Sequence, residues 1–326
     1  MSSEMVSLDD IKVAAERLEP IIVRTPLISS PALDEMAGGR VLLKAENLQR
    51  TGSFKIRGAY NLLSQLTPEQ AARGVIAFSS GNHAQAVAAA GTMLGIETTI
   101  VMPEDAPQIK IENTRRLGGT TVLYDRYTGA RETIAREMAA ERGCAVVPSY
   151  DHEHIIIGQG TAGLEIVEQC EEAGVVPDQV FINCSGGGLT AGCAVAISSQ
   201  LPGTRIHPVE PEEYDDTCRS LESGQREQVD VTAKSICDAL QVATPEKNTF
   251  SINKDLLGGG VRVSDDEVRA ALRFAFLNLK LVVEPGGAAA LAAVLSGKVD
   301  TRDKVTVAMI SGGNIDAALF ASIQSS

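Results

Sequence analysis

Residues 74–95 read GVIAFSSGNHAQAVAAAGTMLG, and this stretch decides the fold class of the chain. It starts as a short apolar, β-branched run, passes through a Ser-Ser-Gly loop, and continues with helical spacing up to a glycine. The same order of strand and helix returns in residues 97–119, 120–143 and 179–201. Such alternation is typical of βαβ units, so we predict an α/β protein with open, mainly parallel sheets.

Two breaks in this pattern predict the domain organisation. The alternating units end near residues 147–149, where a polar loop begins, and an earlier break lies near residues 50–52. We therefore predict a small α/β domain over residues 53–148, set into a larger domain formed by residues 1–52 plus 149–326. A cleft between two such domains is the usual place for a ligand site.

Composition excludes several classes of protein. The 326 residues are 44% hydrophobic and 22% charged, which is an ordinary globular balance with room for a buried core. The net charge of −13 disfavours nucleic acid and anionic membranes as partners. The six cysteines form no C-x-x-C pair, the acidic N-terminus lacks the features of a secretion signal, and no apolar run reaches the ~20 residues that span a bilayer. We expect a cytoplasmic protein.

Three loops that follow apolar strands carry small residues and lead into helices: Ser79–His83, Ser185–Gly188 and Ser311–Asn314. Glycines in such loops let backbone N–H groups approach an anion, and a helix N-terminus adds partial positive charge. A tight βα turn explains any one of them equally well, but three of one kind favour a phosphorylated ligand. None has the G-x-x-x-x-G-K-[ST] pattern that binds nucleotide triphosphates.

One of these loops also fits a second ligand. Residues 186–191 match G-x-G-x-x-A, and Glu210 ends the next strand 22 residues beyond Gly188, as in a dinucleotide-binding turn. Such a turn usually occupies the first βα unit of its domain, whereas several units precede this one. A nicotinamide-dependent oxidoreductase therefore stays an alternative.

Lys55 is the candidate nucleophile. It lies in GSFKIRGA, residues 52–59, just before a predicted helix. A lysine amine is nucleophilic only when desolvation or a neighbouring cation lowers its pKa from ~10.4, and Phe54 and Arg57 could supply both. An exposed lysine at a helix start is the commoner case, and only the combination with the phosphate-type loops favours the catalytic interpretation.

Together these motifs resemble the fold-type II pyridoxal-phosphate (PLP) enzymes, in the branch of threonine/serine dehydratases (ammonia-lyases) and serine racemases. The resemblance covers nearly the whole chain, and it implies a tryptophan synthase β-like α/β fold, PLP as cofactor, and a homodimer or higher homo-oligomer. The motifs occur in the family's order: GSFKIRGA, SSGNHAQ, IIIGQGT, SGGGLTAG, EPGGAAAL and SGGNID.

The resemblance assigns cofactor-binding roles by matching position. Lys55 would hold PLP as a Schiff base, and Phe54 would pack beside the cofactor ring. Asn82 would bind the phenolic oxygen, and Ser311 would face the pyridine nitrogen. A neutral serine there stabilises a pyridinium less than a carboxylate would, which favours elimination over transamination. The backbone amides of the phosphate loop would come from Ser185, Gly186, Gly187, Gly188 and Leu189.

The resemblance also implies a substrate site. Ser80, Asn82 and His83 match the loop that grips the substrate carboxylate, although His83 fits a capping or packing role equally well. Ser80 further corresponds to the acid/base residue of the racemases. Arg131 aligns with an arginine that some relatives use for the same or an extra carboxylate, and a solvated helix face is the alternative interpretation.

Glu210 and Asp216, with the backbone of Tyr214 between them, match a divalent cation site of this branch. Their oxygen ligands suit Mg²⁺ or Ca²⁺, in a structural or activating role. The alternative is that EPEEYDD, residues 210–216, forms a solvated acidic loop.

The implied activity is β-elimination from a small β-hydroxy amino acid. Freed Lys55 would remove the α-proton, the β-hydroxyl would leave, and the released enamine would hydrolyse to a 2-oxo acid and ammonia. We expect L-threonine as the first substrate and L-serine as the second. A 3-hydroxyaspartate dehydratase and a serine racemase are alternatives within the family, and a catalytically inert protein that binds PLP or another metabolite is an alternative outside enzymes.

Overall fold

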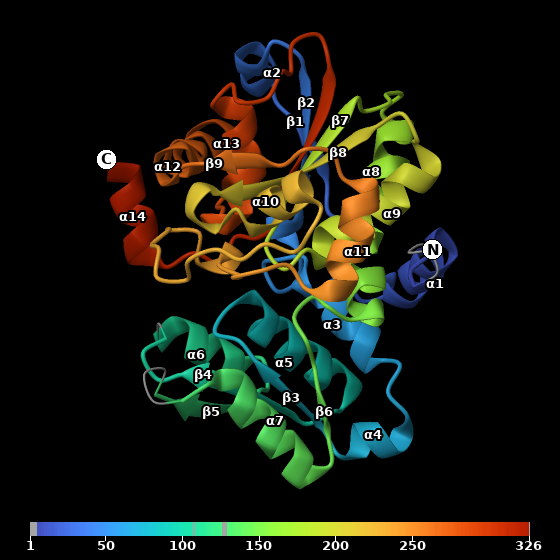
Figure 1. Cartoon of the computed structure of the whole chain (residues 1–326), viewed down its shortest axis with the longest axis vertical. Helices are drawn as coiled ribbons and strands as arrows, with labels where there is room; N and C mark the ends of the chain where they lie inside the picture. Colours follow the sequence, from blue (N-terminus) through green and yellow to red (C-terminus); the bar gives the residue numbers. More distant parts are fainter. Residues whose placement is uncertain (1–4, 107, 126–128, 326) are drawn as a thin grey trace.

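Two separate β-sheets organise the chain (Figure 1). A computed structural model describes residues 5–106, 108–125 and 129–325. The large sheet is parallel except for the pairing of β1 with β2, and the small sheet is parallel throughout. The large sheet has the order β1 (Leu27–Ser29), β2 (Arg40–Ala45), β10 (Val305–Ile310), β7 (Gln179–Asn183), β8 (Arg205–Pro211), β9 (Val261–Val263). The small sheet has the order β5 (Thr120–Tyr124), β4 (Thr98–Pro103), β3 (Val75–Phe78), β6 (Ala145–Val146).

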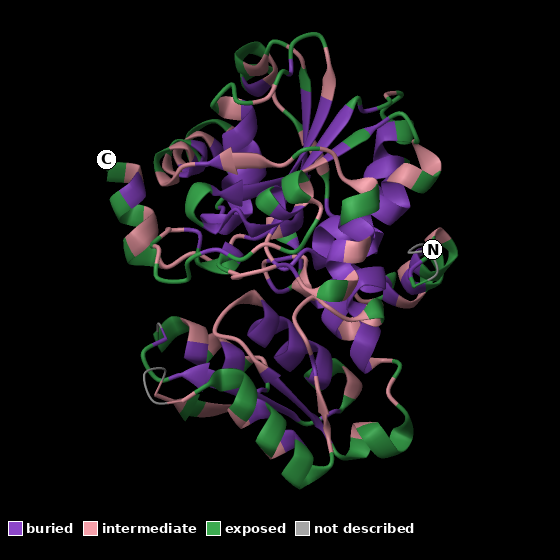
Figure 2. Cartoon of the chain, in the orientation of Figure 1, coloured by how far each residue is buried: buried purple, intermediate pink, exposed green. Residues whose placement is uncertain are grey.

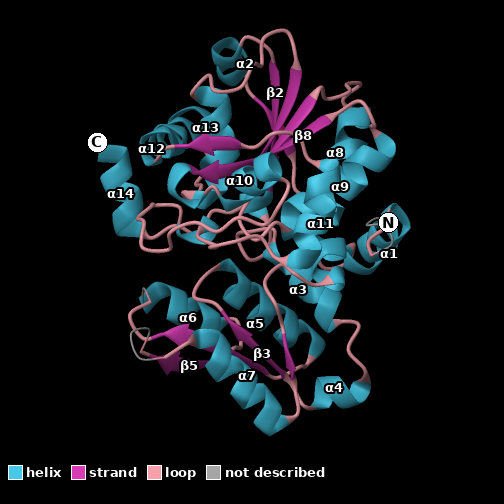
Figure 3. Cartoon of the chain, in the orientation of Figure 1, coloured by secondary structure: helices cyan, strands magenta, loops and turns pink. Residues whose placement is uncertain are grey.

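Helices connect the strands and cover both sheets (Figure 3). Short 3₁₀ segments lie at Glu46–Leu48 (η1), Glu212–Tyr214 (η2), Asp238–Leu240 (η3) and Gly286–Ala288 (η5), and a π-helical turn (η4) spans Ala275–Leu279. The α-helices are α1 (Leu8–Leu18), α2 (Pro31–Ala37), α3 (Lys55–Leu63), α4 (Pro68–Ala72), α5 (Asn82–Leu94), α6 (Gln108–Arg116), α7 (Arg131–Arg142), α8 (Glu153–Glu172), α9 (Gly188–Gln200), α10 (Asp216–Ser223), α11 (Lys247–Leu256), α12 (Asp265–Phe274), α13 (Ala289–Leu295) and α14 (Ala317–Ser325). None of these helices is both long and apolar enough to cross a membrane.

The strands β4 and β7 are buried along their whole length because both faces of their sheets are covered (Figure 2). In β7, Phe181 packs into the cluster that contains Leu291 of α13, whereas the next residue, Ile182, packs with Ile166 of α8 and Ile197 of α9. This alternation follows from the two-residue period of a strand. The central strands are therefore buried, and polar side chains can reach solvent or a ligand only at the strand ends.

The structure confirms the predicted α/β fold with parallel sheets. All small-sheet strands lie within residues 75–146, and all large-sheet strands lie outside residues 53–148. We keep the predicted division into residues 53–148 and residues 1–52 plus 149–326 as a proposal.

Two local expectations are corrected. Lys55 is the first residue of α3 and not part of the preceding loop. The sequence of residues 212–260 shows a less regular pattern than the βα units and predicts an irregular segment, but this segment contains helices α10 and α11. These helices were missed because α10 has eight residues and α11 has ten, so each gives a short periodic pattern.

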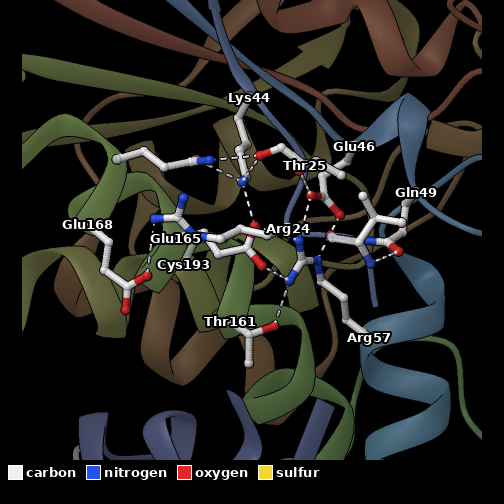
Figure 4. Close-up of polar contacts among 12 residues, drawn as sticks. Arg24, Thr25, Lys44, Glu46, Gln49, Arg57, Thr161, Glu165, Glu168 and Cys193 are labelled. Carbon is white, nitrogen blue, oxygen red and sulfur yellow. Dashed lines mark hydrogen bonds and ion pairs between the residues drawn. The ribbon is translucent and has the colours of Figure 1, made fainter. Parts of the chain in front are cut away.

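A buried ion network fixes the start of α3 against the large sheet (Figure 4). The Arg57 side chain is fully buried, and its Nη2 lies 2.7 Å from Glu46 Oε1 while its Nη1 lies 2.7 Å from Glu165 Oε1. Lys44 Nζ lies 2.5 Å from Glu165 Oε2 and donates to the Thr25 carbonyl oxygen at 2.7 Å. Residues from β2, η1, α3 and α8 are thus joined by paired charges in the interior.

We predict that Arg57→Met lowers the free energy of unfolding by about 3–5 kcal/mol, because Glu46 and Glu165 are then buried without their shared cation. Urea denaturation followed by circular dichroism measures this loss. Arg24→Ala is the control, since Arg24 pairs with the exposed Glu168 and Glu172, and its loss is expected to stay below about 1 kcal/mol. Equal losses in the two variants would contradict the role of the network.

Candidate active site

Hydrogen bonds bring the three glycine-rich loops together between the two sheets. They follow β3, β7 and β10, at the carboxyl ends of parallel strands, where ligands bind in open α/β sheets. Asn183, the last residue of β7, donates its Nδ2 to Ser311 Oγ at 2.9 Å. Asn314 donates its Nδ2 to Asn82 Oδ1 at 2.7 Å, which joins the loop after β10 to the start of α5. The loops therefore form one site rather than three separate turns.

Lys55 lies beside the place where the three loops meet, which we call the junction, at the N-terminus of α3. Its Nζ donates a hydrogen bond to the Ser149 carbonyl oxygen at 2.9 Å and lies 5.1 Å from the centre of the Phe54 ring. Burial lowers the pKa of Lys55 to about 8, and the nearby Glu284 carboxylate acts in the opposite direction. A larger fraction of this amine is uncharged at neutral pH than in free lysine, as a nucleophile or base requires.

The glycines in the loop after β7 are required because the side chains of Tyr150 and Asn253 lie close to its backbone. A methyl group on Gly186 would lie 2.4 Å from carbon atoms of the Tyr150 ring. Gly187 has a φ of +83°, and a methyl group there would lie 2.6 Å from Asn253 Nδ2. A side chain would clash at Gly186, and at Gly187 only glycine fits both the conformation and the space.

Helix α9 begins at Gly188, directly after this loop, so its first N–H groups point toward the junction. Leu189 is buried in the apolar cluster of the large sheet, and this packing anchors the first turn of the helix. Ser185 Oγ is buried and has no hydrogen-bond partner within the described part of the chain. Loop and helix together form an arrangement that binds anions through backbone N–H groups.

Asn82 is held from two sides at the start of α5. Its Oδ1 accepts from Asn314, and its Nδ2 donates to Glu284 Oε1 at 2.5 Å. Glu284 is buried, and burial together with the charge of Asp238 raises its pKa to about 8. Sequence reasoning gave Glu284 no role, although a charged residue at the head of the small-residue run EPGGAAAL was a visible signal.

Ser80 and His83 lie in the same loop and helix start as Asn82, but they differ in environment. Ser80 is partly buried, in the bend between β3 and α5. The His83 ring is buried, and its Nε2 lies 3.0 Å from the Val147 carbonyl oxygen. Burial and the positive charge of Lys55 lower the pKa of His83 to about 3, so the ring is neutral. These contacts favour the packing role that the sequence left open.

Arg131 begins α7 on the small-sheet side of the site, and its side chain is exposed. Its guanidinium carbon lies 5.9 Å from the centre of the Phe78 ring, at the distance of a cation–π contact. Burial raises the pKa of Tyr150 to about 12, and the charge of Arg131 acts in the opposite direction. The guanidinium is therefore within electrostatic range of the ring that packs on Gly186.

Glu210 and Asp216 are buried together next to the site. Glu210 Oε2 accepts from the Cys218 N–H at 2.8 Å, whereas neither carboxylate oxygen of Asp216 has a hydrogen-bond partner within the described ranges. Burial raises the pKa of Glu210 to about 7 and that of Asp216 to about 9, and their mutual repulsion adds to the second shift. The Tyr214 hydroxyl donates to the Ala233 carbonyl oxygen at 2.8 Å. The segment is thus not the solvated acidic loop that the sequence left open.

The residues at the junction fit a bound PLP. The partly buried Lys55 amine would suit the aldehyde, and the glycine-lined loop at residues 185–188 would suit the phosphate. The oriented Asn82 amide and the buried Ser311 hydroxyl would suit the phenolic oxygen and the ring nitrogen. The family described as "Pyridoxal-phosphate dependent enzyme" matches residues 18–312, and the chain belongs to this family.

Within the family, the chain is similar to ammonia-lyases and racemases. It is 41% identical to an L-threo-3-hydroxyaspartate ammonia-lyase from Pseudomonas sp, over 98% of this chain and 99% of that protein. It is 39% identical to a serine racemase from Schizosaccharomyces pombe, over 98% of each chain. The crystal structure of a threonine deaminase from T.th. superposes with a TM-score of 0.89 at 41% identity and covers 95% of this chain and 99% of that one. This membership favours PLP over the nicotinamide alternative.

Proposed function

We propose that this protein is an ammonia-lyase that converts a small β-hydroxy amino acid to a 2-oxo acid and ammonia, with L-threonine and L-serine as substrates. The observation that carries the proposal is the partly buried Lys55 amine of lowered pKa beside the glycine-lined loop at residues 185–188. L-Threonine would yield 2-oxobutanoate, and L-serine would yield pyruvate, each with one ammonia.

When bound, PLP supplies the electron sink that makes the α-proton acidic. Lys55 Nζ would hold the cofactor through its aldehyde and, once the substrate amine takes its place, would accept the α-proton. Ser80 and the first N–H groups of α5 would bind the substrate carboxylate. The β-hydroxyl leaves as water together with one proton, which balances the α-proton that Lys55 accepts. Hydrolysis of the released unsaturated amine takes up one water molecule, so the net products are the 2-oxo acid and ammonia.

The surroundings of Ser311 support elimination. Its Oγ already accepts a hydrogen bond from Asn183 Nδ2, so its own proton is available for donation. A donor at this position pairs with an unprotonated pyridine nitrogen, which is a weaker electron sink than a pyridinium. A weaker sink favours rapid loss of the β-substituent over the proton shifts of transamination.

Lys55→Ala is expected to lower 2-oxo acid formation from L-threonine at least ~1,000-fold, because the variant lacks both the covalent anchor and the base. Production of 2-oxobutanoate measures the loss, and borohydride treatment of the wild type should fix the cofactor covalently at Lys55. The exposed Lys254 offers a control, since Lys254→Ala should retain full turnover. Substantial turnover by Lys55→Ala would refute the assignment.

A second candidate substrate, 3-hydroxyaspartate, is favoured by Arg131. An exposed guanidinium at the rim of the site, over the Phe78 ring, matches the extra carboxylate of a dicarboxylic substrate. The similar Pseudomonas ammonia-lyase is named for this substrate. Serine racemisation with Ser80 as the acid/base residue stays the alternative reaction.

We predict that Arg131→Ala lowers kcat/KM for L-threo-3-hydroxyaspartate by roughly 10- to 100-fold, as loss of a charged hydrogen bond does, and changes kcat/KM for L-threonine less than about threefold. Assays of 2-oxo acid formation from both substrates measure the difference. Arg136→Ala is the matched control on the same helix, because Arg136 pairs with the exposed Glu132. Equal effects of Arg131→Ala on both substrates would exclude this role.

We also propose a divalent cation, Mg²⁺ or Ca²⁺, between Glu210 and Asp216. Two buried carboxylates repel one another, and the unpartnered oxygens of Asp216 are hard ligands of the kind these ions prefer. Within the described ranges no group of three or more His, Cys, Asp or Glu side chains is arranged for a metal, so backbone oxygens, including that of Tyr214, and water would complete the shell.

Chelation is expected to lower the thermal midpoint of the purified protein by about 2–4 °C, since the two carboxylates would lose their cation. Differential scanning calorimetry with and without a chelator measures the shift, and adding Mg²⁺ or Ca²⁺ back should reverse it. Asp216→Asn, which removes one charge at nearly constant volume, should abolish the response. An unchanged midpoint together with the absence of metal in elemental analysis would contradict the proposal.

The homodimeric or higher oligomeric state and the cytoplasmic location remain proposals. Sedimentation of the purified protein and localisation of a tagged chain would test them.

A further inference from the structure

Gln159 of α8 lies at the point where two helices begin. A methyl group built on Gly188, the first residue of α9, would lie 2.7 Å from Gln159 Oε1. A methyl group built on Gly58, in the first turn of α3, would lie 3.2 Å from Gln159 Cγ. The glutamine side chain therefore fills the space between the first turns of α3 and α9.

The amide of Gln159 is buried without a partner. The residue is 1% exposed, and within the described part of the chain neither Nε2 nor Oε1 has a hydrogen bond. Buried amides are rarely left unpaired, because the lost hydrogen bonds to water are not replaced. Two further polar atoms lack partners within the described part of the chain, Ser185 Oγ and Asn253 Oδ1. Ser185 begins the loop that precedes Gly188, and Asn253 donates to the Gly187 carbonyl oxygen in that loop. This concentration of unpaired polar atoms points to a ligand.

The electrostatics at this point favour an anion. The N-terminus of a helix carries about half a positive charge, and α3 and α9 both begin here. Lys55, at the start of α3, adds its amine. In a chain of net charge −13, this local positive field comes from two helix N-termini and the Lys55 amine.

We propose that Gln159 binds the cofactor phosphate by donating an Nε2 N–H to a phosphate oxygen. The proposal rests on the proposed function and extends it, because the sequence assigned the phosphate to the backbone amides of residues 185–189 alone. The sequence interpretation left the glutamine of the IIIGQGT segment without a role. Here Gln159 contacts the ligand directly.

The test compares PLP with pyridoxal, which has the same aldehyde but no phosphate. Both are titrated into the cofactor-stripped full-length chain, and binding is followed by absorbance. Gln159→Met keeps the volume and removes both polar atoms, so we expect PLP affinity to fall roughly 10- to 100-fold, as for a hydrogen bond to a charged group, while pyridoxal affinity changes less than about twofold. Gln159→Glu should weaken PLP binding further through repulsion of the phosphate.

Gln169→Met is the matched control. Gln169 lies on the same helix and is buried, but its amide is paired with Lys44 and Thr25 in the ion network. This substitution should lower stability and leave the ratio of PLP to pyridoxal affinity unchanged. A merely structural role for Gln159 would likewise lower both affinities together, and that result would overturn the proposal.

A crystal structure of the wild-type holoenzyme tests the contact without any variant. An Nε2 to phosphate oxygen distance within about 3.2 Å supports the proposal, and a distance beyond about 3.5 Å overturns it. The outcome is separable from the proposed function. If the wild-type chain takes up neither PLP nor pyridoxal, the proposed function itself fails, whereas normal uptake with an unchanged affinity ratio in Gln159→Met refutes only the role of Gln159.

Discussion

The placement of the candidate nucleophile depends on a group of buried charges. Arg57 follows Lys55 by two residues in α3, and its guanidinium is shared between Glu46 of η1 and Glu165 of α8. Interior ion pairs are costly to desolvate and are stable only with close geometry and full hydrogen bonding. A small rotation of α3 would separate these partners. The network therefore fixes the orientation of the helix whose first residue carries the amine.

Helix α8 also fixes the position of the glycine loop at residues 185–188 and the start of α9, relative to α3. It packs on α3 and α9 through glycines: a methyl group on Gly158 would lie 2.5 Å from the Arg57 carbonyl oxygen, and one on Gly192 would lie 2.3 Å from the Ile156 carbonyl oxygen. Such close backbone contact leaves little freedom for sliding. The amine at the start of α3 and the N–H groups at the start of α9 are thus parts of one rigid assembly, as preorganised binding of a cofactor requires.

Local sequence patterns predicted the fold, because each βα unit carries its own strand, loop and helix signals. The glycine loops and Lys55 could be found in the same way, and the resemblance to PLP enzymes connected them. The pairing of Glu284 with Asn82 and the proximity of Gln159 to Gly188 could not be predicted, since each joins residues far apart in the chain. Nor could periodicity show that Asp216 is buried, because an acidic run usually indicates solvent exposure.

The chain passes from the large sheet to the small one between β2 and β3, and it returns between β6 and β7. The same amine touches both passages, because Lys55 lies in the first and its Nζ donates to the Ser149 carbonyl oxygen in the second. If one sheet rotated relative to the other about these passages, atoms near them would be displaced least and those at the outer rim most. Substrate could thus enter and product leave through a widening mouth while the reactive nitrogen stays almost stationary.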